Sequence, residues 1–261
     1  MEGSEVRLRV IQYFLRNSPV GELKEVLNDL KGIVGDQELL EQETIQDTLI
    51  ECLAAHGATV SIGESQAMLT PQGRTGSSFI DPKIAKRFIF NSHTFEAESV
   101  EEIEPQNSRA QAIQTKLDQY LSQHYSETAQ ARVFTNEDGF SIFLASPVLN
   151  LRNMWTGEWL SNWKVVGNKI EGEINIRAHY FEEGNLQSNQ KKECSKNINE
   201  GDDEAFAQAV SRAIFEFEDQ VHRGMHALYE QIPQACFKSM RRALPVTQTK
   251  FSEIHKTKML S

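Results

Sequence analysis

Two histidines and one cysteine have the types and surroundings that could support metal or thiol chemistry. His222 and His226 lie four positions apart in a predicted helix, a spacing that places two imidazoles on one face, where they could hold a metal ion. A metal-dependent hydrolase of the H-E-x-x-H type also needs a glutamate base after the first histidine, and Arg223 occupies that position. Cys194 follows two lysines that could favour a thiolate, but no histidine is near it in the sequence. The pattern favours polar residues on a helix face and an ordinary cysteine, so we expect no catalytic site, metal or cofactor.

Motif and composition arguments exclude several other classes of protein. Neither a G-x-x-x-x-G-K-[ST] loop nor a G-x-G-x-x-G turn occurs in the 261 residues, so no nucleotide-binding loop is visible. The net charge of -10 argues against binding nucleic acid over the whole surface, although a local basic patch stays open. No run of about 18 apolar residues occurs, so we expect no membrane span. Three cysteines far apart in the sequence are typical of a reduced, cytosolic chain.

Three tryptophans alternate along one segment and form one face of a predicted strand. Odd positions from 155 to 163 read Trp, Gly, Trp, Ser, Trp, and the even positions between them are largely polar. Such a face could stack bases or sugars, but a base platform needs surrounding cations, which this part of the chain lacks. Large aromatic residues on the buried side of a sheet are therefore the favoured interpretation.

The elements that position these residues begin with helices. Apolar residues spaced by three and four predict helices up to Asn17-Ser18-Pro19, over 22–35 and over 37–55, with Gly57 ending the last one. Short connections predict that the three helices pack antiparallel. A hairpin is expected over 58–70, and two short strands over 79–81 and 87–90. The acidic run 96–104 is expected to be a solvated loop, and a helix follows over 108–124.

The second half of the chain predicts a five-stranded antiparallel meander followed by one long helix. Strands are expected over 133–135, 140–146, 155–164, 170–180 and 186–194, joined by turns at Asp138-Gly139, Gly167-Asn168 and 183–185. Apolar residues then recur by three and four from Asp202 to about Gln231. That helix would be about 45 Å long at 1.5 Å per residue, too long for one small sheet to cover its apolar stripe.

The C-terminal segment differs from the rest in charge. Residues 238–261 contain six lysines and arginines against Glu253 alone, a net charge of +5 in a chain of net charge -10. Phe251, Ile254 and Met259 add scattered apolar residues to these cations. A solvated terminus is one interpretation, and a weakly amphipathic segment that binds a partner protein is the other.

Five segments, spread in order along almost the whole chain, resemble the alpha subunit family of the heterodimeric F-actin-capping protein. The first consists of Pro19 with 21–22, 25–26 and 28–29, and the second is 79–82, Phe-Ile-Asp-Pro. The third is 153–164, Asn-Met-Trp-Thr-Gly-Glu-Trp-Leu-Ser-Asn-Trp-Lys, the fourth is 179–185, His-Tyr-Phe-Glu-Glu-Gly-Asn, and the fifth is Phe237-Lys238 with 241–247, Arg-Arg-Ala-Leu-Pro-Val-Thr. The combination of these matches is highly specific.

The resemblance implies an α+β fold with four parts. They are an N-terminal three-helix antiparallel bundle over 1–57, a small β-hairpin region with short strands and an acidic loop over 58–107, a central five-stranded antiparallel sheet crossed by a long covering helix over 108–235, and a short basic actin-binding tail over 236–261. The family has no enzymatic activity, and we expect the same here. Trp155, Trp159, Trp163 and Tyr180 belong to the dimer and core signature that the resemblance implies.

The partners implied are a beta subunit, in an obligate heterodimer, and the barbed end of an actin filament, where capping blocks subunit addition and loss without calcium. The expected location is the cytoplasm, in the cortical actin cytoskeleton. Family residues that contact actin map onto Lys238 and Arg242, beside Arg241, and the expected actin-binding set is completed by Lys250, Phe251 and Ile254. Gln248 stands where the family usually has arginine, so one actin-contacting charge is absent. The alternative is a subunit of the same fold in another complex on actin or an actin-related filament, without capping of free barbed ends.

Overall fold

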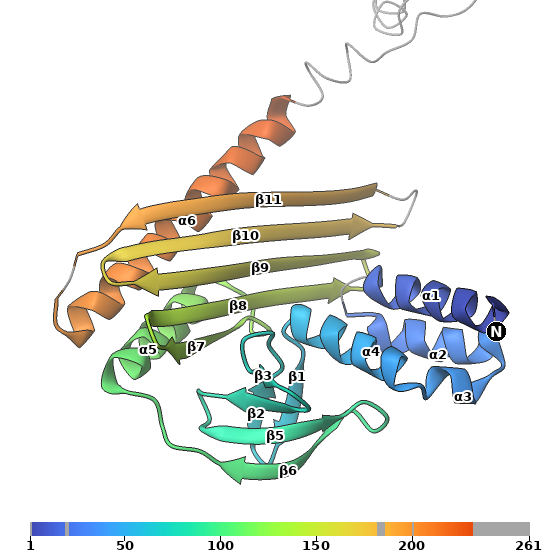
Figure 1. Ribbon diagram of the computed structural model, residues 1–261. Coiled ribbons are helices and arrows are strands. Elements are labelled where there is room, and N and C mark those ends of the chain that lie inside the picture. The colour runs from blue at the N-terminus through green and yellow to red at the C-terminus, as the bar shows by residue number, and fades with distance from the viewer. Residues whose placement is uncertain (1, 19–20, 182–185, 200, 232–261) are drawn as a thin grey trace, which may run out of the picture. The chain divides into compact units, whose positions relative to one another are not determined.

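The computed structural model describes residues 2–18, 21–181, 186–199 and 201–231 (Figure 1). Contacts divide the chain after Ile214 into two units, Met1–Ile214 and Phe215–Ser261, and each is described by itself. The first unit holds a helix bundle, three antiparallel sheets, one further helix and the start of the last helix. In the ranges given above, no helix is both long enough and apolar enough to cross a membrane.

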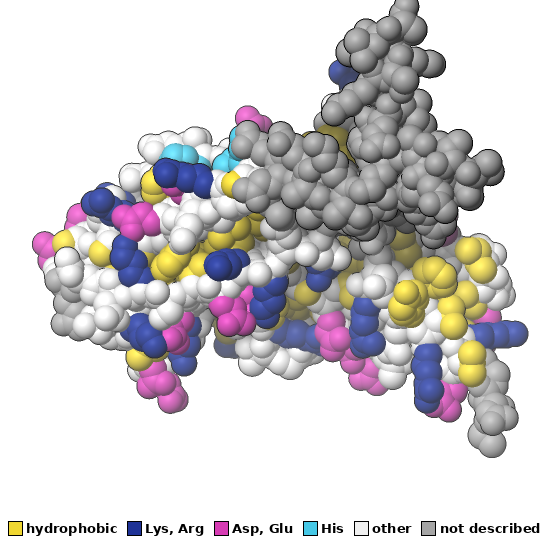
Figure 2. All heavy atoms as spheres, turned by 90° about the horizontal axis from the view of Figure 1, so that it is seen from above, with side chains coloured by type: hydrophobic (Ala, Val, Ile, Leu, Met, Phe, Trp, Pro, Cys, Tyr) yellow, Lys and Arg dark blue, Asp and Glu magenta, His cyan; other side chains and the backbone are white. Residues whose placement is uncertain are grey.

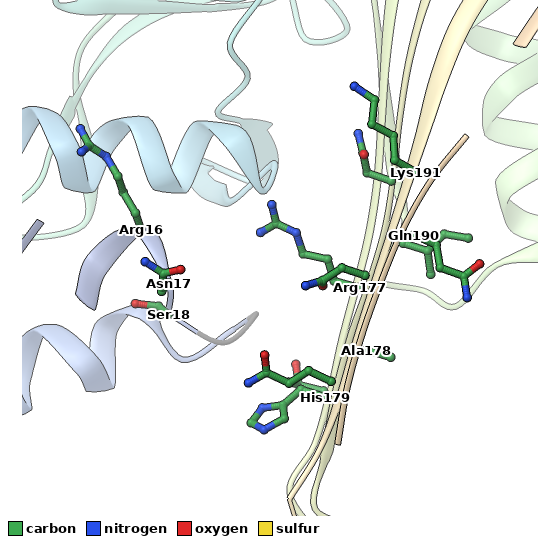
Figure 3. A pocket seen from close by; sticks show the side chains of 13 residues that line it. Arg16, Asn17, Ser18, Arg177, Ala178, His179, Gln190 and Lys191 are labelled. Atoms are coloured by element: carbon green, nitrogen blue, oxygen red, sulfur yellow. The ribbon is translucent and has the colours of Figure 1, made fainter. Parts of the chain in front are cut away.

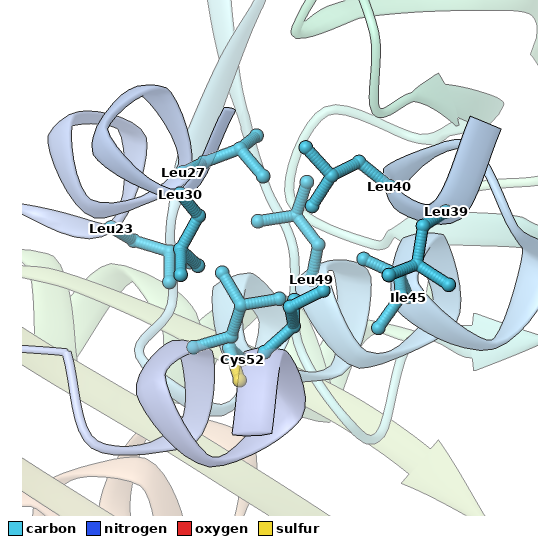
Figure 4. Close-up of a cluster of buried hydrophobic side chains, with 10 residues drawn as sticks. Leu23, Leu27, Leu30, Leu39, Leu40, Ile45, Leu49 and Cys52 are labelled. Atoms are coloured by element: carbon cyan, nitrogen blue, oxygen red, sulfur yellow. The ribbon is translucent and has the colours of Figure 1, made fainter. Parts of the chain in front are cut away.

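The N-terminal bundle forms around leucines and isoleucines at helical spacing. Its helices are α1 Glu2–Arg16, α2 Leu23–Val34, α3 Gln37–Leu40 and α4 Glu43–Ala55. Figure 4 shows their buried side chains converging from all four helices on one cluster. Burial in this cluster raises the pKa of the Cys52 thiol, which is against a reactive thiolate there.

The predicted helix over 37–55 is wrong in one respect, because the chain breaks it into α3 and α4. Gln42 has an extended backbone, φ −61° and ψ 138°, and the side chain of Gln46 donates to the carbonyl of Leu40 at 2.7 Å. Because of this break, the side chains of Leu39 and Leu40 lie in the same hydrophobic core as that of Ile45. At the other end Gly57 has φ +65°, as expected for a residue that ends a helix in the left-handed conformation.

Two small sheets follow the bundle, and they contain two strands that the sequence analysis misses, Arg74–Thr75 and Glu96–Glu102. The strands are β1 Thr59–Ile62, β2 Ser65–Met68, β3 Arg74–Thr75, β4 Ser78–Asp81, β5 Lys86–Asn91 and β6 Glu96–Glu102. The prediction of a solvated acidic loop is wrong, because β6 is an edge strand of the sheet β3-β4-β5-β6. Its glutamates are tolerated because they stay exposed, and Glu101 and Glu102 lie opposite Arg87 and Lys86.

The central sheet confirms the predicted meander, with strand order β11-β10-β9-β8-β7 and every pair antiparallel. The strands are β7 Gln130–Asn136, β8 Gly139–Asn150, β9 Trp155–Val166, β10 Lys169–Tyr180 and β11 Leu186–Asn197. The second strand continues past Ser146 through Pro147. The pairing between β7 and β8 ends at Ala145, so Pro147 needs to donate no hydrogen bond on that side.

The two faces of the central sheet are covered by different elements. One face carries Phe140, Ile142, Trp163 and other apolar residues, and meets α5 Ser108–His124 and the start of α6 Asp203–Gln231. There the ring of Phe206 lies 6.2 Å from that of Phe140. The other face is covered at β7–β9 by the small sheets, where Met68 packs with buried side chains of β8 and β9. The first twelve positions of α6, 203–214, belong to the first unit, and Val210 and Ile214 among them are fully buried.

Candidate functional site

The residues predicted to bind actin lie outside the described part of the chain. They are Lys238, Arg241, Arg242, Lys250, Phe251 and Ile254, and the structure describes nothing beyond residue 231. The tail therefore remains a prediction. The signature residues Trp155, Trp159, Trp163 and Tyr180 all lie on β9 and β10 and can be placed.

The tryptophan face is buried at one end only. Trp163 is 2% exposed and lies opposite Gly172, where a Cβ atom would stand 2.1 Å from the indole ring. Trp159 is half-buried, with its ring 6.5 Å from that of Tyr125. Trp155 is also half-buried and lies opposite Tyr180, which is 37% exposed. Toward Trp155 and Tyr180, therefore, the face is an aromatic surface that this part of the chain covers incompletely.

A second apolar surface runs along α1. Val6, Val10, Tyr13 and Phe14 recur at helical spacing, and their exposed fractions are 59, 47, 64 and 50%. The opposite side of the same helix places Ile11 and Leu15 in the bundle core at 1% exposure. Figure 2 shows hydrophobic side chains gathered at the end of the molecule where α1 lies. An amphipathic helix buries one stripe, so a helix with two apolar stripes has a second surface available for a partner. We call these four residues the α1 stripe.

The third feature is the edge of the central sheet. Among the described strands, β11 pairs only with β10, over all twelve of its residues. Its side chains are almost entirely polar, with lysines at 191, 192 and 196. An edge strand is able to pair with a strand of another chain, and charged side chains discourage unselective pairing.

Two side-chain pairs that the sequence analysis misses join the small sheets and the bundle to the central sheet. Arg132 of β7 donates from Nε to Asp81 of β4 at 2.6 Å, with both side chains at 2% exposure or less. His56, after α4, lies 2.6 Å from the buried carboxylate of Glu158 on β9. The available signal for the first pair was an arginine between two apolar residues, Ala131 and Val133, directly before the predicted strand over 133–135.

The metal hypothesis receives no support from the described residues. In them no group of three or more His, Cys, Asp or Glu side chains could hold a metal ion. His222 and His226 lie on the part of α6 that belongs to the second unit.

The fold is that of an actin capping protein subunit, as comparison with solved structures shows. The structure of the homodimeric actin capping protein alpha subunit from Plasmodium berghei superposes with a TM-score of 0.74 at 18% identity, covering 92% of this chain and 98% of that one. The family model of the F-actin capping protein alpha subunit matches residues 11–259, and the chain belongs to that family.

Curated relatives match this chain along nearly their whole length. The chain is 26% identical to the F-actin-capping protein subunit alpha of Caenorhabditis elegans, covering 94% of this chain and 92% of the relative. It is 28% identical to the same subunit of Yarrowia lipolytica, covering 92% and 88%. This family consists of structural proteins and not of enzymes.

Proposed function

We propose that this chain is the alpha subunit of a heterodimeric F-actin capping protein, which binds filament barbed ends without calcium and blocks the addition and loss of actin subunits. The observation that carries the proposal is the family match over residues 11–259, which spans most of the basic segment as well as most of the part of the chain that the structure describes. The proposed location is the cytoplasm, in the cortical actin cytoskeleton.

Three surfaces of the first unit support a partner subunit. The α1 stripe exposes four apolar side chains, and the Trp155–Tyr180 end of the sheet exposes aromatic area. Each fully buried side chain of this size is worth about 1.5–3 kcal/mol, so covering both surfaces strongly favours association. The edge of β11 could extend the sheet into a beta subunit of similar fold. Together they support an obligate heterodimer, with Trp155, Trp159, Trp163 and Tyr180 as its dimer and core signature.

The proposed actin contact is made by the basic tail. Six cations against one carboxylate suit an acidic filament end, because opposite charges speed encounter and then pair at the interface. Lys238, Arg241, Arg242 and Lys250 are the proposed charged contacts, and Phe251 and Ile254 are the proposed apolar ones.

Barbed-end elongation tests the proposal. The chain is co-expressed with a beta subunit, and the purified complex is added to filament seeds and fluorescent actin in the presence of a calcium chelator. We expect elongation from barbed ends to stop at substoichiometric complex while pointed-end elongation continues. A stable complex that leaves barbed-end elongation unchanged would overturn the proposal.

The second candidate is a subunit of the same fold that serves another actin or actin-related filament complex. The solved relative from Plasmodium berghei is a homodimer of alpha subunits, and this observation supports testing whether the present chain also assembles without a beta subunit. Mass measurement of the chain expressed alone and with a beta subunit shows which assembly forms, and barbed-end elongation with that assembly distinguishes capping from a subunit that does not cap free barbed ends. A homodimer that caps barbed ends would confirm capping and contradict the heterodimer.

A further inference from the structure

The two edges of the central sheet differ in what lies beside them. At the outer strands β10 and β11, a polar cavity of about 410 Å³ separates the sheet from the end of α1, and Arg177 and His179 project from the sheet toward α1 (Figure 3). At the other edge, α5 packs against β7 (Figure 1). Among the described strands, β7 pairs only with β8, as β11 pairs only with β10. Both edges are therefore places where a further strand could add.

The strand β7 lacks the surface charges that protect an edge strand. Its sequence, Gln-Ala-Arg-Val-Phe-Thr-Asn, has one charged residue, Arg132, and that side chain is buried against Asp81 at 2.6 Å. The strand β11, in contrast, carries lysines at 191, 192 and 196. An edge strand with apolar and β-branched residues and no exposed charge pairs readily with another chain. Some other feature must therefore protect β7.

Two glutamine side chains bind the backbone of β7 on the side that faces away from β8. In an antiparallel pair, the backbone groups of every second residue point away from the partner strand. Gln114 of α5 accepts from the backbone N–H of Val133 at 3.1 Å and donates to the carbonyl of Ala131 at 3.1 Å. Gln106 donates to the carbonyl of Val133. Ala131 and Val133 are buried, so these backbone groups need partners within the protein.

The amide of Gln114 takes the place that an added strand would occupy. A side-chain amide offers the C=O and N–H groups of a peptide, and here it binds one N–H and one C=O of β7. Gln106 is held in turn, since Gln111 of α5 donates to its backbone carbonyl at 2.6 Å and the hydroxyl of Thr135 donates to its side chain at 2.7 Å. Both glutamines also line a cavity of about 340 Å³ between α5 and the turn that joins β4 to β5, so α5 alone does not fill the space beside them.

We propose that Gln106 and Gln114 close the β7 edge of the central sheet to strand addition, so that a partner strand can add only at β11. The closure rests on hydrogen bonds within the first unit, whereas its consequence for the partner at β11 rests on the function proposed above. Without the two glutamines, β7 should pair with β7 of a second copy. Antiparallel pairing centred on Val133 places Arg132 opposite Phe134 and brings no like charges opposite each other.

The variant Gln106→Leu with Gln114→Leu tests the proposal, in the full chain purified in its soluble assembly. We expect light scattering to show a species of twice the parent's mass, whose fraction rises with protein concentration, and hydrogen exchange to be faster at the amide of Val133. Adding Thr135→Lys to the double variant should restore the parent's mass, because a lysine at this exposed position of the edge discourages pairing.

Gln46→Leu is the matched control. Gln46 donates to the carbonyl of Leu40 at 2.7 Å inside the bundle, so the same substitution removes a hydrogen bond to the backbone without freeing a strand edge. Equal self-association of this variant, or self-association of the double variant that Thr135→Lys does not reverse, would overturn the proposal. Unchanged exchange at Val133, or faster exchange with an unchanged mass, would overturn it as well, the latter by showing that the glutamines only satisfy the buried backbone.

Two further points keep the test decisive. If the double variant does not fold, Gln106→Leu alone gives the same mass comparison, since it frees the carbonyl of Val133 and leaves Gln114 in place. All masses are compared with that of the parent assembly, whatever its composition. A chain that forms no complex with a beta subunit would therefore contradict the proposed function and leave the result on the β7 edge intact.

Discussion

The carboxylate of Asp81 satisfies three donors from three parts of the fold. It accepts from Arg132 Nε at 2.6 Å, from the backbone N–H of Met68 at 2.8 Å and from that of Lys83 at 2.9 Å. The pair with Arg132 is inaccessible to water and joins a small sheet to the first strand of the central sheet. Desolvation makes such a pair weak as a source of net stability, but the loss of one partner leaves the other charge buried alone.

Asp81→Asn should therefore destabilise the protein by about 3–5 kcal/mol, because Arg132 would keep its charge without a counter-charge. The measurement is the shift in the urea unfolding midpoint of the purified assembly. Asp118→Asn is the control, since Asp118 also pairs with a cation, Lys83, at 2.8 Å but is 36% exposed. That exposed pair should contribute less than about 1 kcal/mol. Equal shifts for the two variants would show that the buried pair has no special role.

The sequence predicts the structural role of some individual residues and not that of others. It finds Gly57 as a helix end, because a left-handed position after a periodic apolar run has a local signal. It misses the pair of Asp81 and Arg132, because partners 51 positions apart are joined only by the tertiary fold. The roles of Lys238 and Arg242 come from the resemblance to a family and stay predictions.

At the scale of elements, the periodic segments are predicted well and the charged or interrupted ones are not. The meander and the long helix follow from sustained alternation of two or of three and four residues. The strand β6 escapes prediction because an edge strand buries almost nothing and therefore shows no apolar pattern. The break between α3 and α4 escapes it because Leu39, Leu40 and Ile45 fit one continuous helical pattern equally well.

Strand register makes a glycine necessary beside the buried tryptophan. Gly172→Ala would place a Cβ atom 2.1 Å from the ring of Trp163, so the indole must move out of its buried site. Overpacking of this kind costs about 1–3 kcal/mol or more. Gly157→Ala is the matched control on the same face, since its Cβ would meet the half-buried Trp155 at 3.3 Å. Thermal unfolding should show a clearly larger loss for Gly172→Ala, and similar losses would contradict the packing of Trp163 described here.

The junction between α5 and α6 should respond to acid. Hydrogen bonds from the hydroxyl of Ser108 and the guanidinium of Arg109 hold the pKa of Asp203 below its usual range. A lowered folded-state pKa stabilises the fold above the unfolded-state value, and this contribution is lost as the pH falls through the folded-state value. Asp203→Asn should therefore lower stability at neutral pH and make the difference from the parent vanish in acid. Unfolding midpoints between neutral pH and the acidic range measure this, and a constant difference would contradict it.

For the whole molecule, the exposed apolar surfaces predict that the chain depends on a partner. Val6→Ser with Tyr13→Ser removes the two most exposed side chains of the α1 stripe. Both lie outside the bundle core, so the bundle should fold, but co-purification with a beta subunit should fall sharply because each side chain contributes about 1.5–3 kcal/mol when buried. Ile33→Ser on α2 is the control, with an isolated side chain at 80% exposure. Normal co-purification of the double variant would exclude the α1 stripe from the interface.

The tail and the rest of the chain have opposite net charges, which predicts how capping depends on salt. Replacing Lys238, Arg241 and Arg242 with alanine removes three of the six tail cations. Interfacial charges act mainly on the rate of encounter, and salt screens them, so the triple variant should cap more slowly and with less salt dependence. Its melting temperature should equal that of the parent, since the proposed contacts are with actin.

Gln248→Arg should act in the opposite direction and tighten capping by about tenfold or less, the value of about 1 kcal/mol for one exposed pair. Barbed-end elongation against complex concentration, at two salt concentrations, measures both variants. A triple variant that caps as fast as the parent at low salt would place the actin contact elsewhere, and the beta subunit would then be the first place to look.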